Sequence, residues 1–587
     1  MAKDTFQKLE LTWIGKGHEP KLEPRILIEQ PEYSYGDSDS GNMLIHGDNL
    51  LALKALEQEY AGKVKCIYID PPYNTGSAFD HYDDGIEHSQ WLSLMKPRLQ
   101  ILNNLLSEDG SIFVSIDNNE MAYLQVLMDE VFARRNRKNI IIIKRGSVTG
   151  AKVINPGLVN ISEFILVYTK NANKWSPNRL SRKKERDDRY GSYIVNYQDD
   201  YAVWRFIPVT QAFALELGIK NTLLKKHFGE NYENELLQFI YRNALRVIRF
   251  ASLDEKSISK KAIDQKKLSL ENKGVTYLME RDGKKPYYIH NGNIILFVKD
   301  RLQEIDGQLT FSEPLTDIWD DVLPNDLHNE GGVEFRKGKK PEKLIQRIMM
   351  LASNEGDLVL DSFLGSGSTA AVAMKMKRKW IGIELGDHAK THCVPRLQSV
   401  VQGEQRGISK AVEWQGGGGF KFYTLAPSLL NKDKYDNWII SKEYNPDMLA
   451  AAMAKQSGFR YEPDGHIYWK QGRSSEKDYI YTTTQFMTVE MLEKIREEMG
   501  PDESLMICAK IYQRECENRF ANITVKKIPQ MLLGKCEFGK EDYSLNIVNL
   551  PHDDVASPSD DEAVDEITDE STGDGPANQS SQINLFY

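Results

Sequence analysis

Cysteine is scarce in this sequence: the 587 residues contain only five, and no two of them form a Cys-x-x-Cys pair. The sequence therefore favours neither a disulfide framework nor a structural zinc site, and we expect no metal centre. The sequence also lacks any apolar run near the about 18 residues of a membrane span, and its amino-terminal segment lacks the apolar core of a signal peptide. These absences favour a protein of a reducing cytoplasm with no membrane partner.

An excess of basic residues is also missing, which at first argues against a nucleic-acid partner. Lys and Arg number 75 and Asp and Glu 85, a net charge of −10. Residues 551–587, however, contain ten acidic residues and no Lys or Arg, so residues 1–550 are neutral overall. Since this last segment has too few apolar side chains to fold alone, we expect an acidic disordered tail.

Within the neutral part, basic residues are concentrated in one stretch. Residues 132–190 contain fifteen Lys or Arg and four acidic residues, a net charge of +11. Such a stretch can neutralise DNA phosphates, although it is also typical of a solvated helical face. A smaller basic cluster lies at 259–267. The candidate phosphate contacts are Lys174, Arg179, Arg182, Lys183, Lys184 and Arg186.

Hydrophobic periodicity divides the chain into segments. Strands and helices alternate over 43–170 and again over 311–400, which is typical of an α/β domain with a largely parallel sheet. A glycine run at 416–419 predicts a further boundary. The predicted segments are an amino-terminal arm (1–42), the first half of the α/β domain (43–170), an inserted domain (171–310), the second half (311–400), a carboxyl-terminal α+β domain (401–550) and the tail (551–587).

The individual elements of the α/β halves follow from the same periodicity. Strands are predicted over 43–46, 64–70, 111–117, 139–144, 163–170, 357–361 and 379–385. Helices are predicted over 50–60, 91–106, 119–132, 341–353 and 369–377. Pro97 predicts a kink in the second of these helices.

The first chemical motif is Asp70-Pro71-Pro72-Tyr73, directly after a buried strand. At that point the Asp70 carboxylate and the Pro71 carbonyl are two acceptors, and Tyr73 offers a flat π face. The prolines fix φ and remove competing N–H donors. This combination suits the exocyclic amine of a nucleobase taken out of its duplex. The plainer interpretation is a strand that ends in a tight proline turn.

The second motif is a glycine loop between a strand and a helix. It contains Asp361, Phe363, Gly365, Gly367, Ser368 and Thr369. Glycines let a ligand approach the backbone, and Glu384, at the end of the next strand, could bind ribose hydroxyls. The loop also reads as the G-x-G-x-x-A pattern of an NAD-dependent oxidoreductase, although four residues intervene between the strand and Gly365. A simple glycine-rich turn is the remaining alternative.

Taken together, the motifs predict one sheet whose halves occur in reversed order. The strands at 357–361 and 379–385 supply its first two positions, and those at 43–46 and 64–70 supply its third and fourth. The sheet is therefore circularly permuted, with 171–310 inserted between its halves.

On these motifs the sequence resembles the β-group amino-methyltransferases of DNA, in which DPPY precedes FxGxG and a target-recognition domain lies between them. It is most similar to the modification subunit of Type III restriction–modification systems. The likeness covers about residues 40–550 and is weaker in 171–310, and it does not explain the acidic tail. The matching segments are LIHGDNL (44–50), DPPYNTG (70–76), FRKGKKPEKLIQRI (335–348), SFLGSGST (362–369), IGIEL (381–385), WQGGGGFKFYTL (414–425) and KKIPQMLLGKCEFGKEDYSLNI (526–547).

The resemblance implies a circularly permuted Rossmann-like methyltransferase sheet with an inserted target-recognition domain and a carboxyl-terminal α+β domain. It implies S-adenosyl-L-methionine as methyl donor and N6 of a flipped adenine as acceptor. Asp70, Pro71, Pro72 and Tyr73 are then the catalytic residues. The implied cofactor-binding residues are Asp48 (at the adenine end), Phe335, Lys340, Asp361, Phe363, Gly365, Gly367, Ser368, Thr369 and Glu384 (at the ribose).

The implied partners are double-stranded DNA, a second copy of the chain in a homodimer, and a helicase-nuclease restriction subunit. The implied location is the bacterial cytoplasm, at the nucleoid when DNA is bound. Three alternatives stay open at this point: cytosine N4 as the methylated atom, a DNA-reading subunit of a larger complex, and the NAD-dependent oxidoreductase.

Overall fold

The computed structural model describes residues 10–73, 88–145, 158–253, 259–281, 283–305, 307–323, 330–333, 335 and 339–543. The predicted tail (551–587) therefore lies outside the described residues. No helix in the described ranges combines the length and hydropathy needed to cross a membrane.

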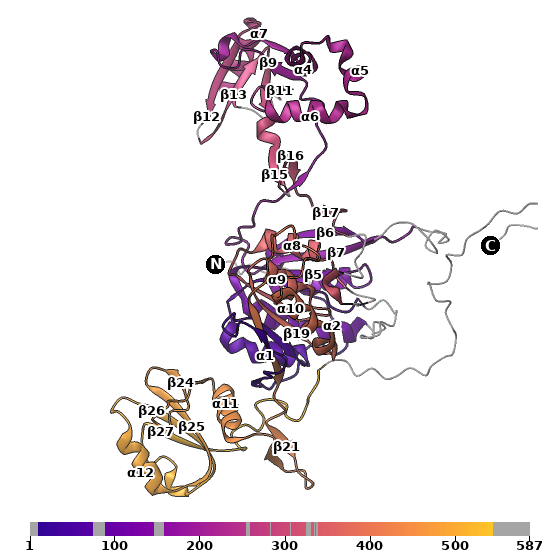
Figure 1. The fold of residues 1–587 in the computed structure, drawn as a ribbon. Coiled ribbons are helices and arrows are strands. Elements are labelled where there is room, and N and C mark those ends of the chain that lie inside the picture. Colours follow the sequence, from indigo (N-terminus) through magenta and orange to yellow (C-terminus); the bar gives the residue numbers. More distant parts are fainter. Residues whose placement is uncertain are drawn as a thin grey trace, which may run out of the picture. The chain divides into compact units, whose positions relative to one another are not determined.

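An 11-stranded mixed sheet contains both predicted α/β halves (Figure 1). Its order is β1-β20-β3-β19-β18-β4-β5-β7-β6-β17, and β2 pairs with β20. Strands β3, β19, β18, β4 and β5 run parallel to one another. The strands are β1 (Leu27–Glu29), β2 (Tyr35–Gly36), β3 (Met43–His46), β4 (Val64–Ile69), β5 (Leu106–Ile116), β6 (Arg137–Lys144), β7 (Ser162–Thr169), β17 (Ile318–Trp319), β18 (Leu358–Asp361), β19 (Lys379–Glu384) and β20 (Gly419–Leu425).

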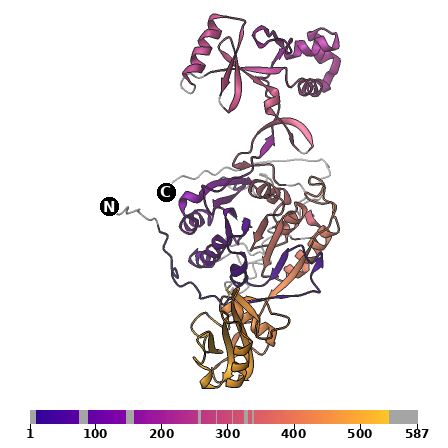
Figure 2. The same ribbon diagram turned by 90° about the vertical axis from the view of Figure 1, so that its left-hand side faces the viewer.

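The strand order interleaves the two halves of the sequence. Strands β18 and β19, from the second half, lie between β3 and β4, from the first. Figure 2 shows the indigo-to-purple and red-brown segments joined in the same sheet. The predicted Rossmann-like sheet with permuted halves is confirmed.

Side chains that alternate along the strands form a hydrophobic core on each face of the sheet. On β4, Cys66 and Tyr68 face one core, whereas Ile67 and Ile69 face the other. The first core is covered by helices α8, α9 and α10, and the second by α1, α2 and α3. The helices are α1 (Asn49–Tyr60), α2 (His88–Leu105), α3 (Met121–Phe132), α8 (Glu342–Ala352), α9 (Ser368–Lys375) and α10 (Val394–Val401).

The structure differs from the predicted segments at one edge of the sheet. β1 and β2, from the predicted arm, pair with β20, from the predicted carboxyl-terminal domain, and β20 runs parallel to β3. Glycine on both strands allows this close pairing: a Cβ on Gly419 would lie 2.1 Å from the Asp37 backbone nitrogen, and a Cβ on Gly36 would lie 2.4 Å from the Gly418 carbonyl oxygen. In addition, α2 continues through Pro97 as a single helix.

The chain between β7 and β17 forms two further sheets with their own cores. The six-stranded sheet has the order β10-β9-β11-β14-β13-β12, and the three-stranded sheet the order β15-β16-β8. The elements are β8 (Ser181–Lys183), β9 (Ser192–Ile194), β10 (Phe206–Pro208), α4 (Val209–Leu217), α5 (Leu224–Phe228), α6 (Tyr232–Arg242), β11 (Val247–Ser252), α7 (Lys260–Glu271), β12 (Thr276–Arg281), β13 (Lys284–His290), β14 (Asn293–Phe297), β15 (Leu302–Ile305) and β16 (Gln308–Pro314).

After β20 the chain forms an α+β region with a five-stranded sheet of order β23-β24-β25-β26-β27 and a two-stranded sheet of β21 and β22. The elements are β21 (Leu430–Lys432), β22 (Trp438–Ile440), α11 (Pro446–Gln456), β23 (Arg460–Tyr461), β24 (Gly472–Ser475), β25 (Asp478–Met487), α12 (Val489–Glu498), β26 (Ser504–Tyr512) and β27 (Ile523–Lys527).

Candidate active site

The DPPY motif lies at the carboxyl end of β4, between strands β18 and β5. Asp70 follows the last residue of the strand, and the Tyr73 side chain is buried. The indole N–H of Trp91, on α2, donates a hydrogen bond of 2.8 Å to the Pro72 carbonyl. The turn is therefore anchored both by the sheet and by α2. Residues 74–76, which complete the DPPYNTG segment, lie outside the described residues.

The ammonium of Lys340 lies against this motif. Its Nζ is 3.4 Å from Asp70 Oδ1, 2.9 Å from Glu163 Oε2 on β7, and 4.8 Å from the centroid of the Tyr73 ring. Arg145 Nε lies 3.2 Å from the other oxygen of Glu163. The sequence grouped Lys340 with the cofactor residues, whereas the structure places its ammonium beside the catalytic candidate Asp70.

The charges of this cluster influence one another strongly. Burial raises the pKa of Asp70 even though the Lys340 cation opposes the shift. Burial also disfavours the Lys340 ammonium, but the carboxylates of Asp70 and Glu163 outweigh it and raise the pKa of Lys340. For Glu163 the effect of burial is outweighed by Lys340 and Arg145, which lower its pKa. Lys340 and Glu163 are therefore a charged pair next to an aspartate that burial pushes towards protonation.

The glycine loop connects β18 to α9 on the strand next to β4. Gly365 and Gly367 have φ values of +56° and +81°, in the left-handed region that favours glycine. Asp361 Oδ1 accepts the Phe363 N–H at 2.9 Å, and its Oδ2 accepts the Thr369 hydroxyl at 2.6 Å. Burial raises the pKa of Asp361 to about 7. The two hydrogen bonds of Asp361 therefore hold the start of the loop against the start of α9.

Glu384, at the end of β19, binds the same loop. Its Oε2 accepts the Gly365 N–H at 2.6 Å, and its Oε1 accepts the backbone N–H groups of Leu385 and Gly386. His388 Nε2 lies 2.9 Å from Oε1. The Phe335 ring packs edge-on against His388, with centroids 5.6 Å apart. The structure therefore brings Glu384, Phe335 and the glycine loop together.

The match to known proteins covers this arrangement. The family model described as DNA methylase matches residues 64–394, from β4 to the start of α10. The chain belongs to the DNA methylase family. Both chemical motifs, and the insert between them, fall within the matched residues.

Relatives of this DNA methylase include three modification subunits. The chain is 38% identical to the probable Type III HindVI Mod subunit of Haemophilus influenzae over 66% of this chain and 54% of that protein. It is 25% identical to the Type III EcoP15I Mod subunit of Escherichia coli over 76% of each chain. It is 28% identical to the Type III EcoPI Mod subunit of Escherichia phage P1 over 65% of this chain and 62% of that one. The chain thus spans little more than half the length of the HindVI relative.

Asp48 of this DNA methylase is engaged by protein donors. Its Oδ1 caps α1 by accepting the Leu51 N–H at 2.9 Å. Its Oδ2 accepts hydrogen bonds from Arg98, at 3.3 Å, and from the Tyr543 N–H, at 3.2 Å. The adjacent Asn49, which the sequence analysis missed, donates a hydrogen bond of 2.8 Å from its side-chain amide to the Ser362 carbonyl in the glycine loop. Contact of Asp48 with a cofactor stays a prediction, and Asn49 is the residue that touches the loop.

A buried charge network, also missed, supports the loop from the other face of the sheet. Arg396, on α10, donates two hydrogen bonds of 2.8 Å each. Its Nη1 donates to the Ser368 hydroxyl and its Nη2 to Glu342 Oε1. Lys375 Nζ, on α9, lies 2.8 Å from Glu342 Oε2. All three charged side chains are fully buried. No local sequence pattern marks this network, because its members come from three separate helices.

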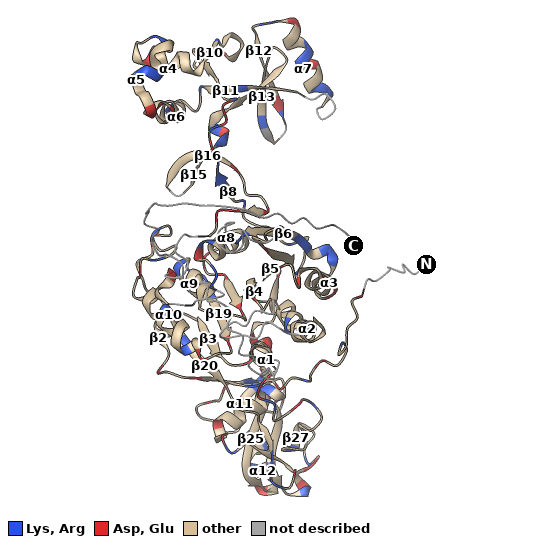
Figure 3. Ribbon diagram, turned by 90° about the vertical axis from the view of Figure 1, so that its right-hand side faces the viewer, with Lys and Arg blue, Asp and Glu red and all other residues tan. Residues whose placement is uncertain are grey.

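The predicted DNA contacts do not form a helical face. Arg182 and Lys183 lie on strand β8, and Figure 3 shows basic residues on this strand. Arg182 and Lys184 both pair with Glu313, at 2.8 and 2.7 Å. The remaining candidates differ in their pairing: Lys174 pairs with Glu108, Arg186 pairs with Asp188 and Glu233, and Arg179 is exposed.

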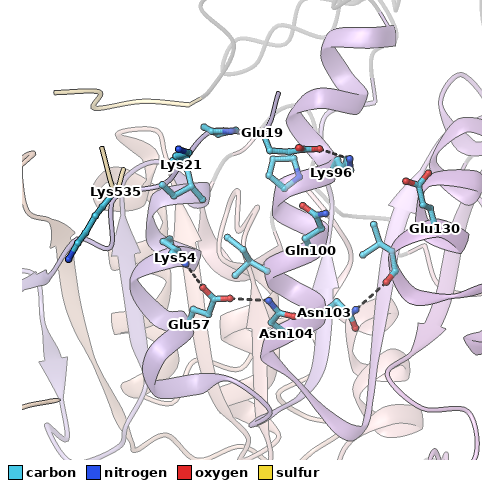
Figure 4. Close-up of a pocket in the computed structure, with 15 residues that line it drawn as sticks. Glu19, Lys21, Lys54, Glu57, Lys96, Gln100, Asn103, Asn104, Glu130 and Lys535 are labelled. Carbon is cyan, nitrogen blue, oxygen red and sulfur yellow. Dashed lines mark hydrogen bonds and ion pairs between the residues drawn. The ribbon is translucent and has the colours of Figure 1, made fainter. Parts of the chain in front are cut away.

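A separate pocket of about 810 Å³ lies beside helices α1 and α2 (Figure 4). Two of its lysines pair with glutamates of the same pocket: Lys54 with Glu57 at 2.7 Å, and Lys96 with Glu19. No DPPY or glycine-loop residue lines it. Within the described ranges, no group of three or more His, Cys, Asp or Glu side chains could hold a metal ion.

Proposed function

We propose that this protein is a site-specific DNA methyltransferase. It transfers a methyl group from S-adenosyl-L-methionine to N6 of an adenine flipped out of duplex DNA. The observation that carries the proposal is the position of the two motifs at the carboxyl ends of the adjacent parallel strands β4 and β18. In open α/β sheets this edge is where ligands bind.

The residues present fit the methyl donor. A Cβ on Gly365 would meet nothing within 4 Å, so the backbone is open to a ligand there. The Ser362 hydroxyl beside it is buried and has no hydrogen-bond partner among the described residues. Gly365, Gly367 and Glu384 would hold S-adenosyl-L-methionine, which supplies an electrophilic methyl group when it is bound. The NAD alternative would leave the DPPY turn and its charge cluster without a role.

The DPPY turn supplies the other half of the chemistry. An exocyclic amine is a poor nucleophile because its lone pair is conjugated with the ring. Asp70 and the Pro71 carbonyl accept its two hydrogens and thereby direct the lone pair towards the glycine loop. Tyr73 holds the plane of the base by stacking. Positioning and electrostatics of this kind can contribute up to about 7–11 kcal/mol to catalysis.

Adenine is favoured over cytosine by the DPPY form of the motif, and cytosine N4 is the second candidate. The Mod names of the relatives support a modification subunit of a Type III system. A homodimer, a helicase-nuclease restriction subunit and a nucleoid location in a bacterial cytoplasm belong to the same proposal. The basic candidates Arg179 and Lys183 would contact DNA phosphates.

The test measures transfer of labelled methyl groups from S-adenosyl-L-methionine to duplex DNA by the full chain. We expect Asp70→Ala and Tyr73→Ala to abolish transfer, while cofactor affinity changes less than about threefold, because neither side chain belongs to the glycine loop. The matched control is Asp109→Ala, whose carboxylate pairs with Lys65 at the start of β4, the opposite end of the strand from the motif, and which should leave transfer intact.

Mass spectrometry of the digested DNA distinguishes N6-methyladenine from N4-methylcytosine. Mass spectrometry of the co-purified cofactor distinguishes S-adenosyl-L-methionine from NAD. Retained transfer by Asp70→Ala, or purification of the chain with NAD, would overturn the proposal.

A further inference from the structure

The Lys340 ammonium lies beside the Asp70 oxygen that the target amine needs. Nζ is 3.4 Å from Asp70 Oδ1, a buried oxygen that accepts no hydrogen bond from the described residues. Nζ also donates to the Tyr73 hydroxyl and is 4.8 Å from the centroid of the ring, which places the ammonium beyond the hydroxyl end of Tyr73. The ammonium thus faces the Asp70 oxygen to which an exocyclic amine would donate, and it lies next to the ring on which the base would stack.

We propose that Lys340 is a positioning residue whose ammonium occupies the target-amine site in the absence of DNA and moves fully onto Glu163 when a base enters. This inference rests on the proposed methyltransferase function. Base entry then exchanges one nitrogen for another beside Asp70, so that the buried carboxylate always faces a nitrogen that carries hydrogens.

The side chain of Glu163 is suited to receive the ammonium. Its Oε2 is already 2.9 Å from Nζ, which is closer than Asp70 Oδ1. Arg145 holds the other carboxylate oxygen at 3.2 Å, so the carboxylate stays in place while Lys340 moves. Lys340 lies just before α8, which anchors its backbone, and its four-carbon stem allows the ammonium the short movement from Asp70 to Glu163.

The exchange also controls the charge of Asp70. Asp70 is influenced by titratable and charged groups from every element around it. These groups are Lys340 before α8, Tyr68 on β4, Tyr73 in the turn after β4, Glu163 on β7 and Asp361 on β18. Lys340 is the cation among them that directly faces Asp70. While it is present Asp70 can remain ionised, and once it has moved the carboxylate can stabilise the positive charge that develops on the amine.

The experiment compares wild type with Lys340→Met, Lys340→Arg and Glu163→Gln. Without the cation, burial should leave Asp70 protonated up to a higher pH. We therefore expect Lys340→Met to move the acid limb of the kcat/KM profile upward by about one pH unit or more, and Lys340→Arg to restore most of the shift. Glu163→Gln should raise KM for DNA more than it lowers kcat, because the ammonium loses its second site.

A second readout does not depend on turnover. With 2-aminopurine at the target position and no cofactor, Lys340→Met should increase fluorescence, because the place of the flipped base is vacant. The matched control is Lys339→Met, since that neighbouring lysine donates to the Val333 carbonyl. It should change neither the pH profile nor the fluorescence.

The outcomes separate the two proposals. If wild type transfers no methyl group to DNA, the proposed function fails. If wild type is active and Lys340→Met shows neither a moved acid limb nor increased fluorescence, the inference about Lys340 fails alone. If Lys340→Met is inactive, unchanged fluorescence overturns the inference and increased fluorescence supports it.

Discussion

Removal of the Glu342 carboxylate should lower the local stability of helices α8 and α9. In Glu342→Ala the Arg396 cation loses the carboxylate that it contacts at 2.8 Å, and Lys375, which also pairs with Glu404, loses a contact of the same length. Because the side chains of Glu342, Lys375 and Arg396 are fully buried, water cannot replace the carboxylate. Breaking a buried ion pair in this way costs about 3–5 kcal/mol.

Native-state hydrogen exchange measures this loss of stability for each helix separately. A local measurement is needed because a chain with several cores does not unfold in a single two-state transition. The expected cost lowers the protection of the amides of α8 and α9 by a factor of about 140 to 3,700. Amides of β25 in the carboxyl-terminal region, which has its own core, serve as the internal reference.

The matched control is Asp321→Asn, which breaks an ion pair between Asp321, just after β17, and Arg347 on α8. Asp321 accepts two hydrogen bonds of 2.7 Å from Arg347, and this guanidinium lowers the pKa of Asp321 to about 2. Since the Asp321 side chain is 46% exposed, solvent screening should reduce the loss to less than about 1 kcal/mol. Equal losses of protection in the two variants, or no loss in Glu342→Ala, would refute the argument from burial.

Two further predictions concern ligands of the proposed methyltransferase. If Lys183 and Lys184 contact phosphates, Lys183→Glu with Lys184→Glu should lower the slope of log affinity against log salt by about 1.8, measured by fluorescence anisotropy with duplex DNA, and an unchanged slope would exclude both contacts. Burial raises the pKa of Asp361 to about 7, so its protonated form stabilises the folded protein at low pH and this contribution is lost as pH rises through about 7. The affinity for cationic S-adenosyl-L-methionine should then increase by up to about tenfold per pH unit from pH 6 towards 7 in calorimetric titrations, and Asp361→Asn should flatten the profile. A profile equally steep in Asp361→Asn would assign the titration to another group.

The fold of the central sheet could be predicted because its parallel strands are buried on both faces. Strands such as 64–69 and 379–384 are short, nearly continuous apolar runs between turn residues, and the structure has them within a residue of the predicted bounds. β20 was harder to place because the glycine run before it is typical of a linker. Only the three-dimensional pairing of Gly419 with Gly36 shows why glycine is needed there, because a Cβ on Gly419 would clash with the Asp37 backbone.

The candidate site was predictable where its residues form local motifs. Asp70 and the glycine loop each follow a strand, so the sequence places both at one edge of the sheet. Lys340 contacts Tyr73 across 267 residues, and no local pattern records such a contact. Arg396 was missed for the same reason, since it reaches Ser368 from a different helix.

The interleaved strand order has a consequence for how the chain is made. β3 and β4 are synthesised early, but β18 and β19, which separate them, follow roughly 290 residues after β4. At about 5–20 residues per second, the ribosome needs roughly 15–60 s to supply them. During that interval the inner edge of β4 presents unpaired backbone groups with no partner strand yet in existence. Completion of the sheet therefore waits on translation of the insert, and the nascent amino-terminal half is the stage at which this protein is most exposed to misassembly.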